Sequence, residues 1–360
     1  MADVTYVRAL IGPILLGGFL SLRPVGAQND LQWPLDPFLQ KYAHATAEEL
    51  GALQRGQPFV RTLKTGDDRD LAIVGAVALD LPKEFFLERY RDIATMKKAP
   101  AVVQIGRFGD RPSPRDIEPL RLDPHDVDTL RHCRAGDCAM RLTKPMIERF
   151  QHDVDWAARD HVEQASHVMR ELLAERATSF LRQGAAAITP YADQGRPVDP
   201  ANAFSALLRD SAYLAEYAPE VERYLEKYPD DAPCPPDGFV YWSKEEWGPV
   251  RVISLTDVTI TPRPCESPRE IVIATRDIYA NHVLDASLAL LVVTDRPEPT
   301  RRPASNLLYI NRSRVDALRG FLSGVRRSIV QRRQQDSTRA YLHDAKVRLE
   351  SAYRANAGSR

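Results

Sequence analysis

The chain has 360 residues, of which 44% are apolar, 27% charged and 8% aromatic, and Lys+Arg and Asp+Glu both total 49. This composition is typical of a globular protein and excludes wholesale disorder, collagen and coiled coil. The balanced charge creates no global field that would attract nucleic acid, so we expect no nucleic-acid partner. The length allows one large domain or two ordinary ones.

The first predicted element is a secretory signal peptide in residues 1–27. Residues 9–22 are an apolar stretch too short to span a membrane, and the small residues Val25, Gly26 and Ala27 follow it. We therefore expect cleavage after Ala27 and a mature protein that is secreted or periplasmic. The alternative, an N-terminal core helix, is disfavoured by the prolines and the paired glycines in this segment. We expect no integral membrane span in the mature chain.

The cysteines agree with export, because an even number in an oxidising compartment favours disulfides. Cys133 and Cys138 enclose a short loop, and Cys234 and Cys265 bracket a region that resembles two strands. We predict that each of these two pairs forms a disulfide. A zinc site is the alternative, but the usual ligand spacing is missing.

The N-terminal third of the mature chain alternates between strand and helix patterns. Residues 28–57 form a leader with one short helix, for which Thr46 is a plausible N-cap with Glu49 three residues on. The segment Leu81-Pro82 opens a helix. The further predicted elements are a hairpin of 59–64 and 71–79, a strand at 102–108, a helix at 126–132 and a short strand at 138–143.

The remaining chain divides into a helical block and a strand-rich region. Residues 144–237 read as a helical insertion, in which Thr143 caps the first helix and a further helix covers 199–217. Five strands follow, at 239–243, 250–261, 270–282, 286–294 and 307–311. We expect them to form one antiparallel sheet with 71–79. A long helix beginning near Ser313 is predicted to pack on that sheet through Leu318, Leu322, Val325 and Ile329, and 336–360 to form its basic end or tail.

The order of these elements is similar to that of a known superfamily. Two segments carry the similarity: AIVGAVALDLPKEFFLERYRDI (72–93) and LLYINRSRVDALRGFLSGVRRSIVQRR (307–333). The first resembles the opening strand, D-x-P step and first helix of the START-like helix-grip superfamily, also called SRPBCC, the polyketide cyclase and lipid-transfer group. The second resembles that superfamily's last strand and closing helix. The resemblance covers about 58–143 and 238–335. It implies an α+β fold in which an antiparallel sheet wraps around a long C-terminal helix and encloses an apolar cavity, here with an all-helical insertion.

If such a cavity exists, five residues are candidates for its lining: Tyr241, Tyr279, His282, Tyr309 and Asn311. All lie on or beside predicted strands and would add a few polar atoms to an apolar wall. Ordinary core or cross-strand packing is the alternative for the tyrosines. A one-residue slip in strand register would turn each of the five outward.

Motifs that would identify a reaction are missing, and we expect no cofactor and no metal. His282, with Asp285 three residues on and Ser254 or Ser287 as nucleophile, could form a catalytic set, but a hydrogen-bonded structural histidine is the ordinary interpretation. Residues 152–167 carry His and Asp at helical spacing, which is more typical of a solvated helix face than of a metal site.

These observations favour an exported binding protein that holds an apolar or lipid-like small molecule. One alternative is a secreted hydrolase or cyclase on the same scaffold that uses His282. Another is an envelope interaction protein whose cavity is filled by its own side chains.

Overall fold

The computed structural model describes residues 33–229, 237–248, 250–261, 270–296, 303–315 and 323–357, without the side chains of 323–326. These residues all belong to one compact unit, Gln32–Arg360. The predicted signal peptide and the predicted Cys234–Cys265 pair lie outside the described residues.

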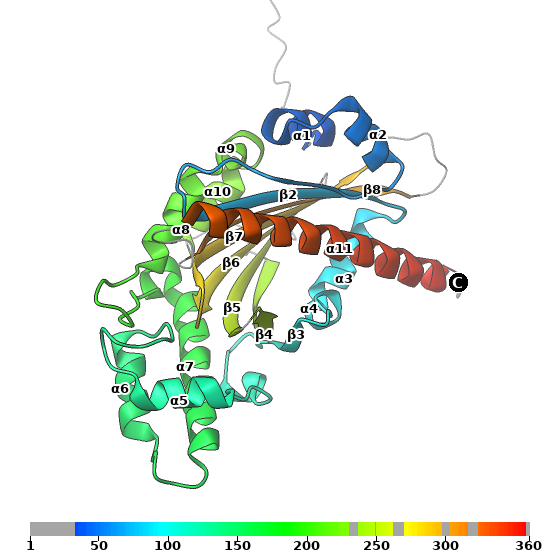
Figure 1. Cartoon of the computed structure of the whole chain (residues 1–360). Coiled ribbons are helices and arrows are strands. Elements are labelled where there is room, and N and C mark those ends of the chain that lie inside the picture. The colour runs from blue at the N-terminus through cyan, green and yellow to red at the C-terminus, as the bar shows by residue number, and fades with distance from the viewer. Residues whose placement is uncertain are drawn as a thin grey trace, which may run out of the picture. The chain divides into compact units, whose positions relative to one another are not determined.

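The protein has an α+β fold built on one open antiparallel sheet (Figure 1). Within the described residues the strand order is β1-β2-β8-β7-β6-β5-β4-β3. The strands are β1 (Phe59–Thr62), β2 (Asp70–Leu79), β3 (Val102–Arg107), β4 (Asp237–Trp247), β5 (Val250–Thr261), β6 (Glu270–Ala280), β7 (Leu284–Asp295) and β8 (Ser305–Val315). The predicted hairpin is confirmed, since β1 pairs with β2, and the five late strands join β2 in one sheet as predicted.

The helices fall into two groups along the chain. The first comprises α1 (Leu35–Ala43), α2 (Ala47–Gln54), α3 (Lys83–Arg91) and α4 (Ile93–Met96). The second comprises η1 (Pro114–Ile117), α5 (Pro124–His132), α6 (Lys144–Asp153), α7 (His161–Gln183), η2 (Gly184–Ala187), α8 (Pro200–Arg209), α9 (Ala212–Tyr217) and α10 (Pro219–Lys227). The long C-terminal helix is α11 (Ser323–Ala357).

Local capping explains two of the predicted helix starts. Thr46 and Glu49 form a reciprocal capping box at the start of α2, and the Thr143 hydroxyl caps α6 by accepting from the Met146 amide. Three local predictions are wrong. The leader 28–57 carries two helices, α1 and α2, where one short helix was predicted. Residues 138–143 lie outside every strand, and the single helix predicted over 199–217 is interrupted between α8 and α9.

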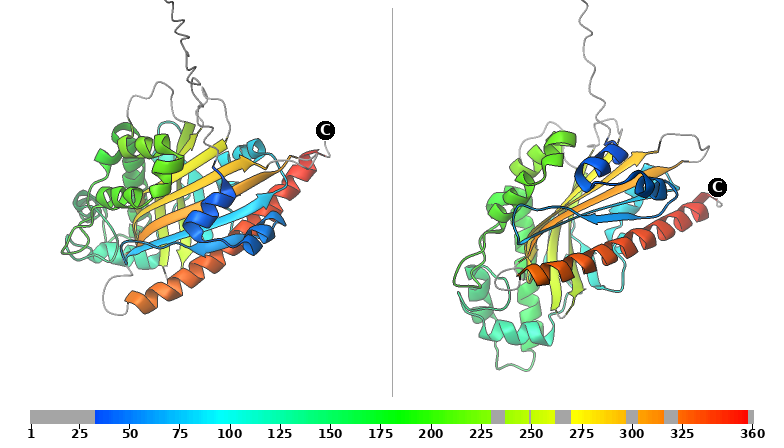
Figure 2. Two further views of the ribbon diagram at one scale, coloured as in Figure 1. Left: turned by 90° about the horizontal axis from the view of Figure 1, so that it is seen from above. Right: turned by 45° about the horizontal axis from the view of Figure 1, so that its top comes forward.

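Helices cover both faces of the sheet. On one face, α1, α2 and α8–α10 bury alternate apolar residues of β2, β8, β7 and β6. On the same face α5–α7 cover the part made by β4, β5 and β6. The opposite face carries α3, α4 and α11, and we call it the α11 face. Figure 2 shows α11 on one side of the sheet and α8–α10 on the other.

The C-terminal helix differs from the prediction in where it begins. Residues 312–315 continue strand β8 and pair with β2 and β7, and the helix begins at Ser323 and runs to Ala357. It therefore continues through residues 336–360 as far as the structure describes them. Leu318, Leu322 and the side chain of Val325, which were predicted to pack on the sheet, lie outside the described residues.

The packing of α11 also differs from the prediction. Ile329 is 50% exposed, whereas Leu342, Ala345 and Leu349 are buried. The helix packs against β1, β2 and α3, so it lies over one edge of the sheet and leaves the central strands beyond it (Figure 1). Gly75 permits this approach, because a Cβ there would lie 2.6 Å from Leu342 Cδ1.

Polar contacts fix the same helix to the turn between β2 and α3. The Lys346 ammonium donates to the carbonyl of Ala78, and the Asp80 amide donates to Glu350 Oε1 at 2.9 Å. Lys346 and Glu350 also pair with each other. The D-x-P segment is thus held directly by the last turns of α11.

The predicted disulfide between Cys133 and Cys138 is confirmed, with 4.6 Å between the two Cα atoms. It closes the loop that follows α5, and Cys133 is buried in the core beneath α5–α7. Among the described helices, none is long and apolar enough to span a membrane.

Candidate functional site

The α11 face of the sheet is apolar at both ends and carries a band of polar side chains between them. At one apolar end lie residues such as Phe239, Val258 and Ile273, packed against α3 and the last turns of α11. At the other end Leu71 and Val252 belong to a smaller apolar cluster that packs against Val330 of α11. Strand pairing places a row of mostly polar residues between the two clusters. These residues are Tyr241, Ser243 and Glu245 of β4, Ser254 and Thr256 of β5, Thr275 and Asp277 of β6, Ser287 of β7, and Tyr309, Asn311 and Ser313 of β8.

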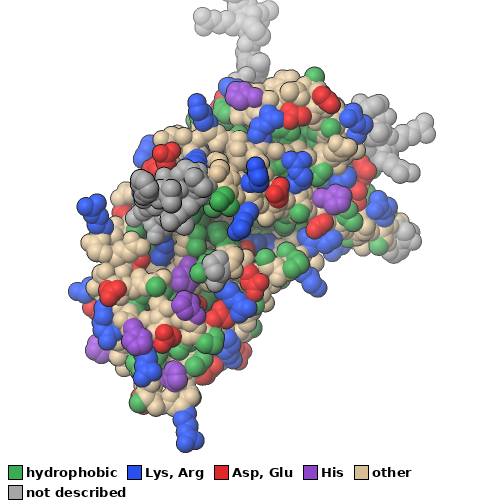
Figure 3. Space-filling view, in the orientation of Figure 1, with side chains coloured by type: hydrophobic (Ala, Val, Ile, Leu, Met, Phe, Trp, Pro, Cys, Tyr) green, Lys and Arg blue, Asp and Glu red, His purple; other side chains and the backbone are tan. Residues whose placement is uncertain are grey.

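Solvent reaches this polar band from the α11 side of the sheet. Asp277 lies on β6 and Tyr309 and Asn311 on β8, and these strands have hydrogen-bonded neighbours on both sides, yet all three residues are partly exposed. Because the neighbouring strands block the sides, the opening lies over the α11 face. Figure 3 shows the surface hollowed between α11 and the β4–β5 part of the sheet. We call this space the hollow.

A partly buried ion pair closes the β4 side of the hollow. Lys97, at the end of α4, donates to Glu245 Oε1 at 2.8 Å and to the Tyr241 hydroxyl at 3.3 Å. The Lys97 and Glu245 side chains keep only 27% and 20% of their exposure. Burial alone would lower the pKa of the Lys97 ammonium, but Tyr241 and Glu245 raise it well above its ordinary value. Lys97 is therefore a cation whose charge Glu245 balances.

Asp277 is the second charged group on the floor of the hollow. The Thr256 hydroxyl donates to its Oδ1 at 2.7 Å, and the Ser287 hydroxyl also hydrogen-bonds to the carboxylate. Burial raises the pKa of Asp277 to about 6, and the two hydroxyls and Lys97 offset only part of this effect. A partly exposed carboxyl with such a pKa can bind a cation or exchange a proton near neutral pH.

Tyrosines from four elements converge around these charges: Tyr90 of α3, Tyr241 of β4, Tyr309 of β8 and Tyr341 of α11. Burial raises the pKa of each phenol. Lys97 acts on all four, and Tyr309 responds to Tyr341, Tyr241 and Asp277, which places these groups in one electrostatic neighbourhood. The hollow thus combines aromatic surface with hydroxyl donors that stay protonated at neutral pH.

Of the five predicted lining residues, Tyr241, Tyr309 and Asn311 lie on the α11 face, and Tyr279 and His282 do not. Tyr279 belongs to the core on the other face, where its hydroxyl donates to the carbonyl of Arg141. The cause is a bulge in β6: Asp277 pairs with Thr256 but Tyr279 pairs with Leu255, so one extra residue reverses the alternation. We find Tyr279 to be a core residue.

His282 lies in the turn between β6 and β7, where its Nε2 lies 3.2 Å from Asp126 Oδ1 of α5. The predicted partner Asp285 instead pairs with Arg141, and both side chains are buried. Ser287 contacts Asn311 and Asp277 on the α11 face. These contacts do not assemble the Ser–His–Asp arrangement that the sequence left open.

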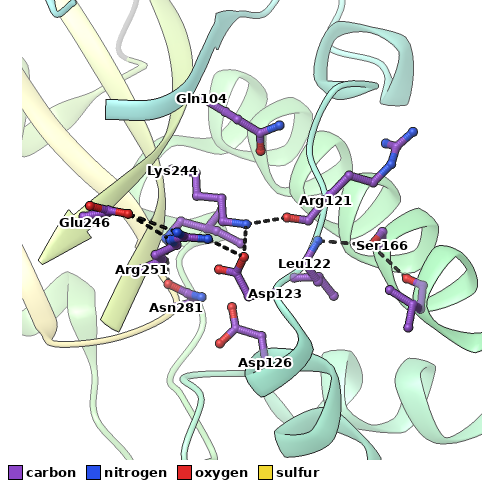
Figure 4. Close-up of polar contacts among 12 residues, drawn as sticks. Gln104, Arg121, Leu122, Asp123, Asp126, Ser166, Lys244, Glu246, Arg251 and Asn281 are labelled. Carbon is purple, nitrogen blue, oxygen red and sulfur yellow. Dashed lines mark hydrogen bonds and ion pairs between the residues drawn. The ribbon is translucent and has the colours of Figure 1, made fainter. Parts of the chain in front are cut away.

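An open cleft of about 520 Å³ adjoins Asp126, lined by Asp123, Pro124, His125, Asp126, Glu246, Gly248, Val250 and Arg251. Figure 4 shows Lys244 and Arg251 converging on Asp123, whose Oδ1 accepts from both at 2.9 Å. Arg251 also pairs with Glu246, and Lys244 also donates to the carbonyl of Arg121. These charges satisfy one another, so we assign them to structure.

The histidine-bearing segment 152–167 has the solvated character that the sequence favours. Two of its acidic residues pair with arginines, Asp153 with Arg149 and Glu163 with Arg170. Within the part of the chain that the structure describes, no group of three or more His, Cys, Asp or Glu side chains could hold a metal ion.

Sequence reasoning missed Lys97, Glu245, Asp277 and Tyr341. A signal existed for Asp277, because it is an acidic residue in the otherwise apolar strand pattern IVIATRDIYA. Lys97 and Tyr341 lie on helices, and no local pattern indicates that they meet over the sheet.

The chain matches no known protein-family model, no curated protein and no solved structure. The START-like resemblance therefore stays a prediction, and function has to be argued from the site itself.

Proposed function

We propose that the protein is an exported binding protein that holds a small organic molecule in the hollow. The observation that carries the proposal is the polar band of the α11 face, where Asp277, Tyr309 and Asn311 of central strands are partly exposed. A sheet face that served only for packing would be apolar and covered, as the two ends of this face are.

The floor of the hollow also indicates the character of the molecule. Polar residues such as Asn311 adjoin Ala289 and Leu291 of β7, which lead into the apolar end that packs against α3. A ligand with an apolar body and a hydrogen-bonding group fits this change in polarity. The lipid-like ligand expected from the sequence is thereby narrowed to an amphipathic one.

Two further observations support the proposal. The order of strand β2, helices α3 and α4, a strand meander and a closing helix on the same face agrees with the helix-grip arrangement that the resemblance implies. The Cys133–Cys138 disulfide agrees with export to an oxidising compartment.

The test is saturable binding of the neutral fluorescent probe N-phenylnaphthylamine, together with native mass spectrometry for a co-purifying molecule. Ala289, 7% exposed on the floor, is replaced by Trp to fill the hollow. The matched control is Ala340→Trp on the exposed side of α11. We expect loss of probe binding only in Ala289→Trp, with both variants folded by circular dichroism. Failure of the wild type to bind the probe or to retain any molecule would favour the interaction-protein alternative.

A second candidate is an enzyme on the same scaffold with Asp277 as general acid or base, which its pKa of about 6 favours. In this candidate Asp277 takes the role that the sequence offered to His282 as an alternative. Turnover of a panel of esters and enolisable carbonyl compounds, with a pH profile that changes near pH 6 and is lost in Asp277→Asn, would support the enzyme. Binding without turnover would support the carrier.

A further inference from the structure

The charge of Asp277 is not balanced by a basic side chain. Lys97 is the nearest cation that affects it, but the Lys97 ammonium is engaged by Glu245 at 2.8 Å. Among the described residues, no Lys, Arg or His nitrogen lies within ion-pair distance of the Asp277 carboxylate, whose hydrogen-bond partners are the hydroxyls of Thr256 and Ser287. Among the side chains that the structure describes, the hollow therefore contains one pair of opposite charges and one negative charge without a cationic partner.

The arrangement around Asp277 holds this carboxylate in place without neutralising it. Thr256 lies opposite Asp277 on the neighbouring strand β5, and Ser287 lies on the other neighbour, β7. Two hydroxyl donors fix the orientation of the carboxylate, and they add no positive charge. A partly buried carboxylate without a cation costs stability, so its presence on an open floor calls for a partner that arrives from solution.

The aromatic side chains add a second feature that attracts cations. Lys97 Nζ already lies 5.2 Å from the centre of the Tyr241 ring, so this part of the hollow accommodates a cation over an aromatic face. Tyr309 and Tyr341 lie close enough to Asp277 or Lys97 to interact electrostatically with them. Aromatic rings beside an unpaired carboxylate are the combination that recognises ammonium groups.

We propose that the hollow selects an organic cation, an alkylammonium or quaternary ammonium group attached to an apolar body, with its nitrogen against Asp277 and its body toward Leu291. This inference rests on the proposed function and names the ligand class. An anionic ligand such as a fatty acid is disfavoured, because Lys97, the lysine that the described residues place at the site, is already neutralised by Glu245.

The pH dependence follows from the titratable groups around Asp277. Lys97 at the end of α4, Glu245 and Tyr241 on β4 and Tyr309 on β8 interact with Asp277 itself. Tyr341 on α11 and Tyr90 on α3 interact with Lys97. The pKa of Lys97 and of the tyrosines is raised and that of Glu245 is lowered, so these groups keep their charge states around pH 6. Asp277, with a pKa of about 6, is the group that changes charge there.

The experiment compares two probes with the same alkyl chain, decyltrimethylammonium and decanoate, by calorimetric titration of the full mature protein. We expect decyltrimethylammonium to bind at least about tenfold more tightly than decanoate at neutral pH. Asp277→Asn should weaken binding of decyltrimethylammonium by about tenfold. The matched control is Glu270→Gln, which removes another carboxyl of β6 with a pKa of about 6 that lies away from the hollow, beside Trp33.

A second measurement needs no variant, so it holds even if Asp277→Asn does not fold. Lowering the pH through the pKa of Asp277, about 6, should weaken the wild-type affinity for the permanent cation, because protonation removes the negative charge. Equal or tighter binding of decanoate, or cation binding unaffected by pH, would overturn the inference while neutral-probe binding still upheld the proposed function. Failure of all three probes would overturn both.

Discussion

The Thr256 hydroxyl donates a hydrogen bond to Asp277 Oδ1 across the β5–β6 pair, with 2.7 Å between the two oxygens. This contact orients the carboxylate on the floor of the hollow and stabilises its charged form. Burial nevertheless outweighs it and raises the pKa of Asp277 to about 6. The site is therefore maintained at a cost to the stability of the folded chain, as is common for functional groups.

Asp277→Asn should stabilise the protein at neutral pH. The folded-state pKa is raised, so the folded chain binds a proton more readily than the unfolded chain, and the ionised carboxylate destabilises the fold above about pH 6. We expect a gain of about 1 to 2 kcal/mol in the free energy of unfolding at neutral pH. The gain should shrink as the pH falls from about 6 toward the ordinary range of Asp, near 4, because wild-type Asp277 is then neutral in the folded state too.

Urea denaturation of both proteins at several pH values checks this prediction. Comparing the two proteins at each pH cancels the contribution of Glu270, whose pKa is also raised to about 6. A variant less stable than the wild type at neutral pH would show that Asp277 has a structural ionic role.

The sheet was predictable from the sequence because its strands are long, apolar and separated by turns. Strand pairing of β1 with β2 follows from the local hairpin pattern. The sequence also placed β2 and β8 in one sheet, but no local pattern indicates that these two distant strands are neighbours. The face of the sheet on which each strand residue lies was harder to predict, because side chains alternate between the two faces only until a bulge. Tyr241 and Tyr309 come before any irregularity and face the hollow, whereas Tyr279 follows the bulge and faces the opposite core.

The charged part of the site could not be predicted in the same way. Lys97 and Glu245 are far apart in the chain, and their contact depends on where α4 and β4 end. The packing of α11 was misjudged for a related reason. Apolar spacing at the start of the helix resembled a packing stripe, but the buried stripe begins later, near Leu342.

Leu342→Ala should destabilise the protein by about 3 kcal/mol, because it leaves a cavity beside Gly75 where the helix approaches the sheet most closely. Ile329→Ala should change stability by less than about 0.5 kcal/mol, since Ile329 is 50% exposed. Chemical denaturation measures both. A larger loss of stability in Ile329→Ala than in Leu342→Ala would contradict this packing and support the contact of Ile329 with the sheet that the sequence predicted.

Asp123→Asn should be costly because Lys244, whose side chain is 4% exposed, would lose its carboxylate counter-ion and keep a buried charge with only neutral acceptors such as the Arg121 carbonyl. We expect a loss of about 3 kcal/mol. Arg251→Ala should cost much less, because this partner of Asp123 is exposed to solvent. The double variant Asp123→Asn with Lys244→Met should recover part of the loss, and thermal unfolding that showed no recovery would contradict the assignment of this cluster to structure.

Reduction or serine replacement of Cys133 and Cys138 should lower the free energy of unfolding by about 2 kcal/mol, the entropy of closing a short loop. Peptide mapping without reductant should recover the two cysteines as one linked peptide. Free thiols at both positions in protein isolated from the extracellular fraction would contradict the pairing.

His282→Ala should reduce stability and leave binding in the hollow unchanged. His282 Nε2 is 3.2 Å from Asp126 Oδ1, while the second oxygen of Asp126 is buried without a hydrogen-bond partner among the described residues. Removing the imidazole leaves the whole carboxylate unpaired at a site only 4% exposed, which should cost about 1 to 3 kcal/mol. His282→Gln, which retains a side-chain donor, should recover part of this loss. The affinity for N-phenylnaphthylamine should match the wild type in both variants, because His282 is not on the α11 face.

Ester turnover that survives Asp277→Asn but disappears in a folded His282→Ala variant would instead make His282 the catalytic base and move the functional site to the cleft beside Asp126.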